Sequence, residues 1–223
     1  MKRSQEEIQN QIINYFNCVI EKYGNNGSYL SWEHCYRFFH KNKEENLDCN
    51  LAVLHLGFYL ASWGMYRGSS AIRNYDYRIH IPAIKILNQH DTSTYFHISD
   101  FSEKNIQGIS RLYSEIASYY QENVRHVSGR GNTRLISTET LVTKILLGTL
   151  GCTPAYDRFV KSGLNVLGIK NKFNLNNFKE ICDFCRKNTG ISAAQYCIGR
   201  NYPIMRIFDI FCHSEHAKHN QAG

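Results

Sequence analysis

A nearly continuous apolar run at residues 51–65 constrains the fold of this chain more than any other stretch. It is long enough for about four helical turns and shows no wide polar face. A helix that is apolar on all sides must be covered by other elements, so we expect it at the centre of the molecule. Its glycine-rich end brings Trp63, Tyr66 and Arg67 together, which indicates either a pocket rim or aromatic rings packed in the core.

Helical periodicity recurs along the rest of the chain. Apolar residues return every three or four positions in residues 4–23, 81–87, 101–125 and 141–150, and a further helix begins near Trp32. No stretch of useful length alternates like a β-strand, and no internal repeat is visible. We therefore expect an all-α fold. Residues 1–223 form a single helical domain, either undivided or built as two closely packed lobes, about 1–100 and 101–223, with a cleft between them.

Composition limits the class of protein. Hydrophobic residues make up 43% of the chain and aromatic residues 13%, which is too rich for a disordered protein. No stretch reaches the roughly 18 apolar residues of a membrane span, and the charged N-terminus lacks the apolar segment of a signal peptide. We expect a cytoplasmic protein with no membrane partner. The formal net charge of +7 favours a polyanionic partner such as DNA, with a solvated cationic face as the alternative.

The eight cysteines are scattered, and without a secretion signal we expect them to be reduced and mostly buried. Cys182 and Cys185 have the spacing of a metal-binding pair, but Cys185 also fits the apolar face of a helix. A structural zinc site usually shows two compact ligand pairs, so we expect no metal and leave this pair as the one candidate. His213, His216 and His219 recur at three-residue spacing in a polar C-terminal segment, which is typical of a frayed, solvated end.

A bend between two apolar runs carries the strongest catalytic candidate. The run at 141–150 stops at Gly151, crosses a bend that contains Pro154, and meets Asp157 where the next apolar run begins. Asp is a favoured N-cap, and the helix dipole at that position favours a negative charge. The carboxylate would therefore be held in place and charged, which capping requires and catalysis can use.

Other acidic residues have simpler explanations. Glu139 falls in the first turn of the helix that runs to Leu150, where a negative charge complements the helix dipole. Asp209 fits a buried acid that pairs with Arg200 or Arg206. Asp157 is therefore the catalytic candidate.

A basic Gly-x-Gly segment precedes this helix. Glycines this close together can present backbone N–H groups to a phosphate, although flexible surface turns have the same pattern. We expect DNA contacts from this segment and from two cations that follow Asp157, namely Gly129, Arg130, Gly131, Asn132, Arg134, Arg158 and Lys161.

Taken together, residues 127–160 resemble the helix-hairpin-helix DNA glycosylases, the superfamily that includes endonuclease III and the adenine and alkylated-base glycosylases. In that family a Gly-x-Gly hairpin binds phosphate, an apolar helix follows, and a Pro/Ala bend delivers a catalytic Asp. Residues 127–131 resemble the hairpin, 140–150 the helix and 154–157 the bend, although the interval from Gly131 to Asp157 is longer than the family's. A second alignment takes Gly148 and Gly151 as the hairpin, which leaves Asp157 too close to serve as the catalytic acid.

The resemblance implies a hydrolase that binds double-stranded DNA, flips out a modified base and breaks its N-glycosidic bond, with Asp157 as catalytic carboxylate. It implies a base pocket formed by Trp63, Tyr66, Arg67 and Tyr156, and it requires no cofactor. A narrower likeness, to bacterial anti-phage glycosylases that excise modified cytosines such as glucosylated hydroxymethylcytosine, rests on size, helical content and the Asp157 region.

Bifunctional members of the family carry a Schiff-base lysine near the start of the helix after the hairpin. This chain has Asn132, Thr133 and Arg134 there, and Lys144, deeper in the helix, is expected to face solvent or phosphate. We therefore expect a monofunctional enzyme. The alternative is a non-catalytic helical protein that binds nucleic acid or a partner and in which Asp157 only caps a helix.

Overall fold

The computed structural model describes residues 3–42, 49–68, 70–95, 101–124, 126–127, 133–134 and 138–221. These residues form ten α-helices, three short 3-10 helices and two paired strands of two residues each, so the expected all-α class is confirmed. The α-helices are α1 (Gln5–Tyr23), α2 (Tyr29–Lys41), α3 (Cys49–Ser62), α4 (Ile81–Gln89), α5 (Glu103–Asn123), α6 (Glu139–Thr149), α7 (Arg158–Val166), α8 (Leu175–Lys187), α9 (Thr189–Ile198) and α10 (Ile204–Gln221). The 3-10 helices are η1 (Gly24–Asn26), η2 (Ala71–Asn74) and η3 (Tyr77–His80). None of the described helices has the length and hydropathy that crossing a bilayer requires.

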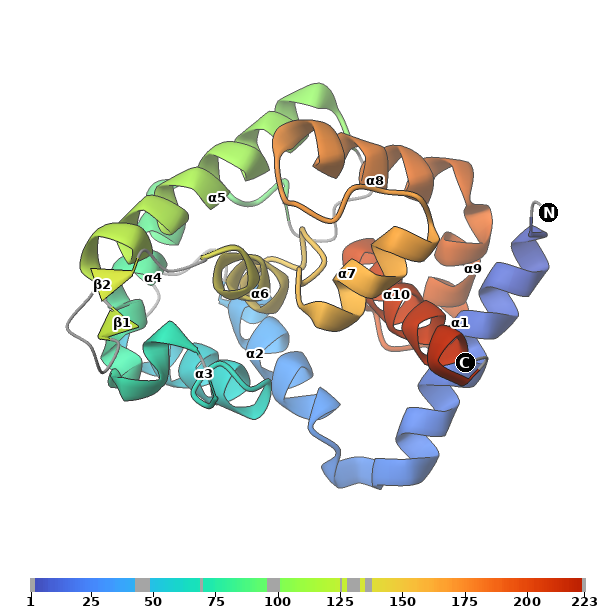
Figure 1. Ribbon diagram of the computed structural model, residues 1–223, viewed down its shortest axis with the longest axis horizontal. Coiled ribbons are helices and arrows are strands. Elements are labelled where there is room, and N and C mark those ends of the chain that lie inside the picture. Colours follow the sequence, from blue (N-terminus) through green and yellow to red (C-terminus); the bar gives the residue numbers. More distant parts are fainter. Residues whose placement is uncertain are drawn as a thin grey trace.

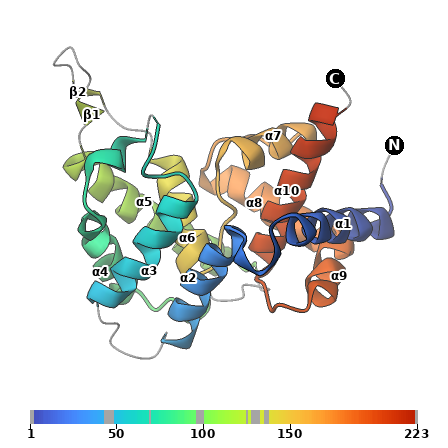
Figure 2. The same cartoon turned by 90° about the horizontal axis from the view of Figure 1, so that it is seen from below.

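The helices pack in two groups that share one continuous core (Figures 1 and 2). Helices α2 to α6 form the first group. In the second group α10 packs against α1, α7 and α9, and α8 links this group to α5. A division near residue 100 therefore does not follow the packing: the chain starts in the second group, and α5 and α6 belong to the first. The approach of α1 to α9 is close, because a Cβ on Gly190 would lie 2.2 Å from the carbonyl oxygen of Gln5.

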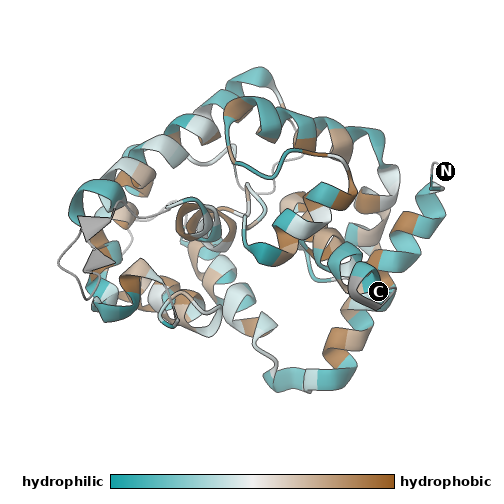
Figure 3. Cartoon of the chain, in the orientation of Figure 1, coloured by the Kyte–Doolittle hydropathy of each residue, from teal (hydrophilic) through white to brown (hydrophobic). Residues whose placement is uncertain are grey.

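Helix α6 occupies the centre of the molecule. Residues 141–149 are all buried, and the ribbon of α6 lies in the middle of Figure 1 with the other helices around it. In Figure 3 its hydrophobic colouring is correspondingly strong. The prediction that the helix of residues 51–65 is covered on all sides is wrong, since α3 buries one face and leaves Leu51, Leu54 and Phe58 exposed. The length of an apolar run shows that a helix is packed, but the neighbouring elements decide how many of its faces are covered.

Local capping accounts for where several helices begin. Ser4 forms a capping box with Glu7 at the start of α1, Ser102 caps α5, and Asn174 caps α8. The cap that concerns the candidate site is Asp157, at the start of α7.

Candidate active site

A cleft of about 1410 Å³ lies between the two groups of helices. Its walls come from α1, the segment that follows α3, the first half of α6, the start of α7 and one face of α10. Its described lining includes four cations, Arg67, Lys144, Arg158 and Arg206, and one carboxylate, that of Asp157. The part of the cleft wall that the structure describes is therefore predominantly positive.

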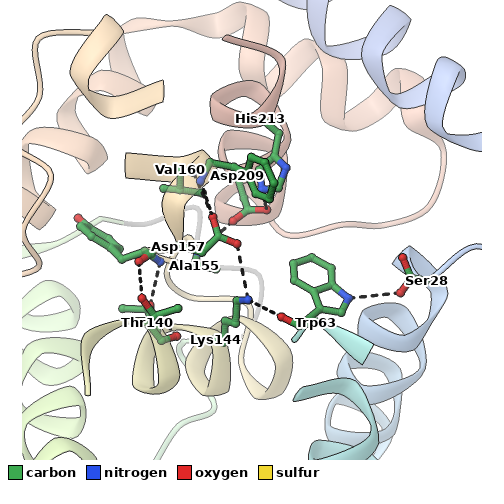
Figure 4. A network of polar contacts seen from close by, with 12 residues as sticks. Ser28, Trp63, Thr140, Lys144, Ala155, Asp157, Val160, Asp209 and His213 are labelled. Carbon is green, nitrogen blue, oxygen red and sulfur yellow. Dashed lines mark hydrogen bonds and ion pairs between the residues drawn. The ribbon is translucent and has the colours of Figure 1, made fainter. Parts of the chain in front are cut away.

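Asp157 caps α7 with one carboxylate oxygen. Its Oδ1 accepts hydrogen bonds from the backbone N–H groups of Phe159 at 3.0 Å and Val160 at 3.2 Å, so the predicted N-cap is confirmed. Its Oδ2 makes neither bond and lies 3.6 Å from Nζ of Lys144 (Figure 4). The side chain is thus fixed by one oxygen while the other is directed to the lysine in the cleft.

The bend before Asp157 is held by side chains from α6 and α10. The hydroxyl of Thr140 donates to the carbonyl oxygen of Tyr156 at 2.8 Å, and the N–H of Tyr156 donates to Oγ1 of Thr143 at 2.9 Å. The N–H of Ala155 donates to Oδ1 of Asp209 at 3.0 Å (Figure 4). Consecutive backbone groups are therefore satisfied by side chains, which restricts the position of Asp157 at the end of the bend.

Asp209 is the buried acid that we expected to pair with an arginine. Its carboxylate is fully buried and accepts a hydrogen bond from Arg206, which settles the choice between Arg200 and Arg206. Arg200 instead pairs with Glu33. Asp209 therefore supports the bend and neutralises part of the Arg206 charge.

Lys144 was expected to face solvent or phosphate, and the expectation of a solvent-facing side chain is wrong. Its side chain is only 6% exposed, and its Nζ donates to the carbonyl oxygen of Trp63 at 2.8 Å and pairs with Asp157. Burial lowers the pKa of Lys144 below its ordinary value, while the carboxylates of Asp157 and Asp209 partly oppose that shift. The lysine does not face bulk solvent because its side chain ends between the Trp63 carbonyl and Asp157. Its position inside an apolar run was the signal available in the sequence.

Aromatic side chains line the cleft on both sides. Trp63 was predicted, and its ring centre lies 4.8 Å from the Arg206 guanidinium and 5.7 Å from Lys144 Nζ. Tyr15 from α1 and Phe159 from α7 also line the cleft, and neither was predicted. Tyr15 lies on an unremarkable amphipathic helix, so only the folding of α1 onto the C-terminal helices reveals its place.

Two residues expected in the base pocket lie elsewhere. Tyr156 is fully buried in the core, where its ring packs edge-on against Phe173 at 5.3 Å, so its assignment to the pocket is wrong. Tyr66 does not line the cleft; its hydroxyl is hydrogen-bonded to Nε2 of His80 at 2.8 Å. Arg67 lines the cleft as expected, with its guanidinium against Gly64.

Of the predicted DNA-binding residues, the structure describes the side chains of Arg158 and Lys161. Arg158 is exposed at the cleft, with its guanidinium 4.5 Å from the ring centre of Phe159. Lys161 is paired with Glu139 of α6, which lies in the first helical turn as expected, so much of its charge is neutralised.

Most of the Gly-x-Gly segment lies outside the part of the chain that the structure describes. The residues Gly129, Arg130, Gly131 and Asn132, and the side chain of Arg134, lie outside the described residues. On either side of them, β1 (His126–Val127) pairs antiparallel with β2 (Thr133–Arg134).

The alternative hairpin at Gly148 and Gly151 is wrong. Gly148 lies inside α6, where an added Cβ would be 2.4 Å from the Tyr59 ring, and Gly151 packs against Pro203 with a positive φ of 65°. Both are buried by protein and present no backbone to a phosphate.

The metal candidates do not assemble into a site in the described part of the chain. Cys182 and Cys185 are buried on α8, and burial raises the pKa of the Cys182 thiol to about 12. No three His, Cys, Asp or Glu residues among those described are placed to hold a metal ion. His213 and His216 belong to α10 and line the cleft beside Phe159, so the prediction of a frayed segment is wrong for them.

The geometry therefore combines a fixed carboxylate, a buried amine and aromatic walls in one cationic cleft. Comparisons of the chain with protein-family models, with curated proteins and with solved structures give no match.

Proposed function

We propose that this protein is a DNA glycosylase that takes a modified base, flipped out of double-stranded DNA, into the cleft and hydrolyses its N-glycosidic bond. The observation that carries the proposal is the position of Asp157. One oxygen is occupied by capping α7, and the other lies 3.6 Å from Nζ of Lys144 in a cleft that is lined by cations and aromatic rings.

Asp157 supplies the chemistry that this reaction needs. Cleavage of the base–sugar bond leaves positive charge on C1′ of the sugar, and a fixed carboxylate stabilises that charge electrostatically. The same carboxylate accepts a proton from water as the water oxygen bonds to C1′. The departing base keeps the bonding electrons and takes up a proton, so the products are the free base and an abasic site.

The walls of the cleft suit a nucleotide. Trp63, Tyr15 and Phe159 offer ring faces on which a base can stack, and the surrounding arginines favour phosphate. The volume exceeds the roughly 300–1,000 Å³ of typical small-molecule sites. That room supports a base with a bulky substituent, such as the glucosylated hydroxymethylcytosine of phage DNA.

The test is release of base from defined DNA. We expect alkali-labile abasic sites when the protein is incubated with duplexes that carry modified bases, including phage DNA with glucosylated hydroxymethylcytosine. Asp157→Asn should abolish base release while retaining DNA binding, because Asn also caps helices well. Asp183→Asn, which changes a half-exposed acid on α8, is the matched control and should retain activity. If none of these DNAs yields abasic sites, or if Asp157→Asn remains active, the proposal fails.

The position of Lys144 calls for a second measurement. A monofunctional enzyme was expected because no lysine follows the Gly-x-Gly segment, but Lys144 lies beside Asp157. We retain hydrolysis by water as the proposed reaction, so borohydride should trap no covalent adduct between protein and DNA. An adduct that forms with the wild type and disappears in Lys144→Met would show that the amine, rather than water, attacks C1′.

The non-catalytic alternative rests on the two capping bonds, which alone would explain an Asp at position 157. In that case the protein binds DNA without releasing any base. Asp157→Ala then lowers stability by roughly 0.5–2 kcal/mol and has no activity to remove.

A further inference from the structure

Arg206 is more deeply buried than the other arginines that line the cleft. Arg67 and Arg158 are exposed residues, whereas Arg206 is only 7% exposed. A guanidinium that is removed from water needs acceptors for its N–H donors, because a buried donor without a partner costs free energy. The contacts of Arg206 therefore show how far the protein itself meets this need.

The protein supplies acceptors to only part of the guanidinium. Among the described residues it donates one hydrogen bond, from Nη1 to Asp209, and its Nε has no acceptor. Nη1 is the terminal nitrogen on the side of Cδ, so this bond leaves the opposite edge, which Nε and Nη2 form. That edge carries two parallel N–H donors and matches a pair of neighbouring acceptor atoms.

Two indole rings hold the guanidinium in place. Its central carbon lies 5.0 Å from the ring centre of Trp32 and 4.8 Å from that of Trp63. Trp32 is fully buried and its Nε1 donates to the carbonyl oxygen of Leu147 at 3.0 Å, so one of the two rings is itself fixed. A ligand that binds this arginine therefore loses little free energy in ordering a long side chain.

One carboxylate connects Arg206 with the bend that carries Asp157. Asp209 accepts from Arg206 with Oδ2 and from the N–H of Ala155 with Oδ1, so it fixes both the guanidinium and the bend. In a flipped nucleotide the base enters the pocket, while the phosphates stay on the DNA backbone. A buried arginine that is tied to the bend is thus placed for the base, and the exposed Arg67 and Arg158 are placed for phosphate.

We propose that Arg206 binds the flipped base through two adjacent acceptor atoms and stabilises the charge that the base gains as it leaves. This role rests on the glycosylase activity proposed above. Cytosine offers such a pair in N3 and O2, and guanine in N7 and O6, whereas thymine and adenine alternate donors with acceptors.

The two hydrogen bonds act on the leaving base. When the bond between C1′ and the base breaks, its electron pair passes to the base and spreads over the ring nitrogens and the carbonyl oxygen. Hydrogen bonds from a cation to these atoms therefore strengthen in the transition state. The hydroxyl of the attacking water stays on C1′, and its proton ends on the base.

NMR spectroscopy of the whole protein tests whether Arg206 binds the base. The signal of its Nε–H group, assigned by its loss in Arg206→Lys, reports on an acceptor at that atom. We expect at least one of deoxycytidine and deoxyguanosine to move this signal, and thymidine, deoxyadenosine and inorganic phosphate to leave it in place. If neither of the first two moves it, or if one of the other three moves it as far, the proposal is overturned.

The rate of base release tests whether Arg206 stabilises the leaving base. Arg206→Lys keeps a cation beside Asp209 but loses the two-donor edge. We expect kcat on DNA with glucosylated hydroxymethylcytosine to fall by roughly 100-fold or more, with little change in KM. Arg200→Lys is the matched control, because Arg200 pairs with Glu33 and is not among the residues that line the described cleft. It should keep the wild-type kcat.

The outcomes separate this role from a structural one and from the activity itself. An Arg206→Lys variant that keeps the wild-type kcat, whether or not its melting temperature falls, overturns the role in catalysis. The NMR measurement needs no turnover. If the protein releases no base from any DNA, the proposed activity fails, while the NMR signal still decides whether Arg206 binds a base.

Discussion

At the scale of single residues, Lys144 shows how burial and charge oppose each other at one atom. Burial disfavours the ammonium form, whereas the neighbouring carboxylates favour it, and the net effect lowers the pKa of Lys144. Its Nζ is held by the Trp63 carbonyl and by Asp157. The side chain is thus kept beside the carboxylate of the proposed catalytic residue.

This shift predicts a rise in stability with pH. The folded protein releases the Lys144 proton at a lower pH than the unfolded chain, whose lysines titrate near 10.5. Between those two pKa values the unfolded state binds more protons, so the free energy of unfolding increases with pH. The buried thiols, whose pKa values burial raises, affect the wild type and Lys144→Met alike. We therefore expect the free energy of unfolding of the wild type to gain on that of Lys144→Met as the pH rises toward about 10.5, as measured by urea unfolding at a series of pH values. Parallel pH profiles for the two proteins would contradict it.

The burial of His80 predicts how the stability of the protein changes at acid pH. It is fully buried between the hydroxyls of Tyr66 and Tyr120, and burial lowers its pKa from 6.5 to about 3. Below pH 6.5 the His80 side chain binds a proton in the unfolded state but stays neutral in the folded state. Stability is therefore lost as the pH falls from 6.5 toward 3, by roughly 5 kcal/mol at most at about 1.4 kcal/mol per pH unit.

The His80 prediction is checked by unfolding measurements in acid. His80→Gln should lose less stability than the wild type over this interval, whatever its stability at neutral pH. His34→Gln, which changes an exposed histidine on α2, should follow the wild-type profile. Equal acid sensitivity of His80→Gln and the wild type would show that another group controls the transition.

At the scale of elements, the bend between α6 and α7 depends on side chains that are distant in the sequence from one another. Thr143 accepts the backbone N–H of Tyr156, while Asp209 from α10 accepts that of Ala155. Tyr156 itself is buried, so a lost partner cannot be replaced by solvent. The position of Asp157 is thus a property of three helices and not of the bend alone.

Removing one hydroxyl should therefore be costly. Thr143→Val keeps the shape of the side chain but leaves the N–H of Tyr156 without its partner, and we expect a loss of about 1–3 kcal/mol in the free energy of unfolding. Thr143→Ser keeps the acceptor and should lose less. Chemical denaturation of both variants measures the difference. If Val is as stable as Ser, the hydroxyl does not support the bend.

Most helix ends follow from the local sequence, whereas the number of faces that a helix buries does not. Periodicity over residues 4–23 and 101–125 anticipated α1 and α5 to within about two residues, and the cap at Asp157 placed the start of α7. These signals lie within a few turns of the helices concerned. Whether a helix is buried on all sides depends on helices that are distant in the sequence. This is why α6, and not α3, lies at the centre of the molecule.

At the scale of the whole molecule, each group of helices contains residues from both sides of residue 100. Helix α1 completes the group that contains α9 and α10, and α5 and α6 complete the group that contains α2 and α3. The cleft between them draws on both groups, and Tyr15 and Asp157 come from the second. A cut at residue 100 separates each group from a helix that it needs.

Fragments made at that position should therefore not fold alone. We expect residues 1–100 and residues 101–223, expressed separately, to lack cooperative thermal unfolding by circular dichroism, because each exposes apolar faces that the other covers. Mixing or co-expressing them should restore a cooperative transition. A cooperative transition in either fragment alone would mean that its helices form an independent core.

The sequence by itself determined the helical class, most helix positions and the cap at Asp157, because periodicity and capping act between residues only a few positions apart. It also offered Trp63, Arg67 and Arg158, which line the cleft. Only the tertiary structure decided that Lys144 lies beside Asp157, that Tyr15 joins the same cleft and that Tyr156 is sealed in the core. The physical reason is that burial and pairing depend on which distant helices meet, and this is settled by packing over the whole chain.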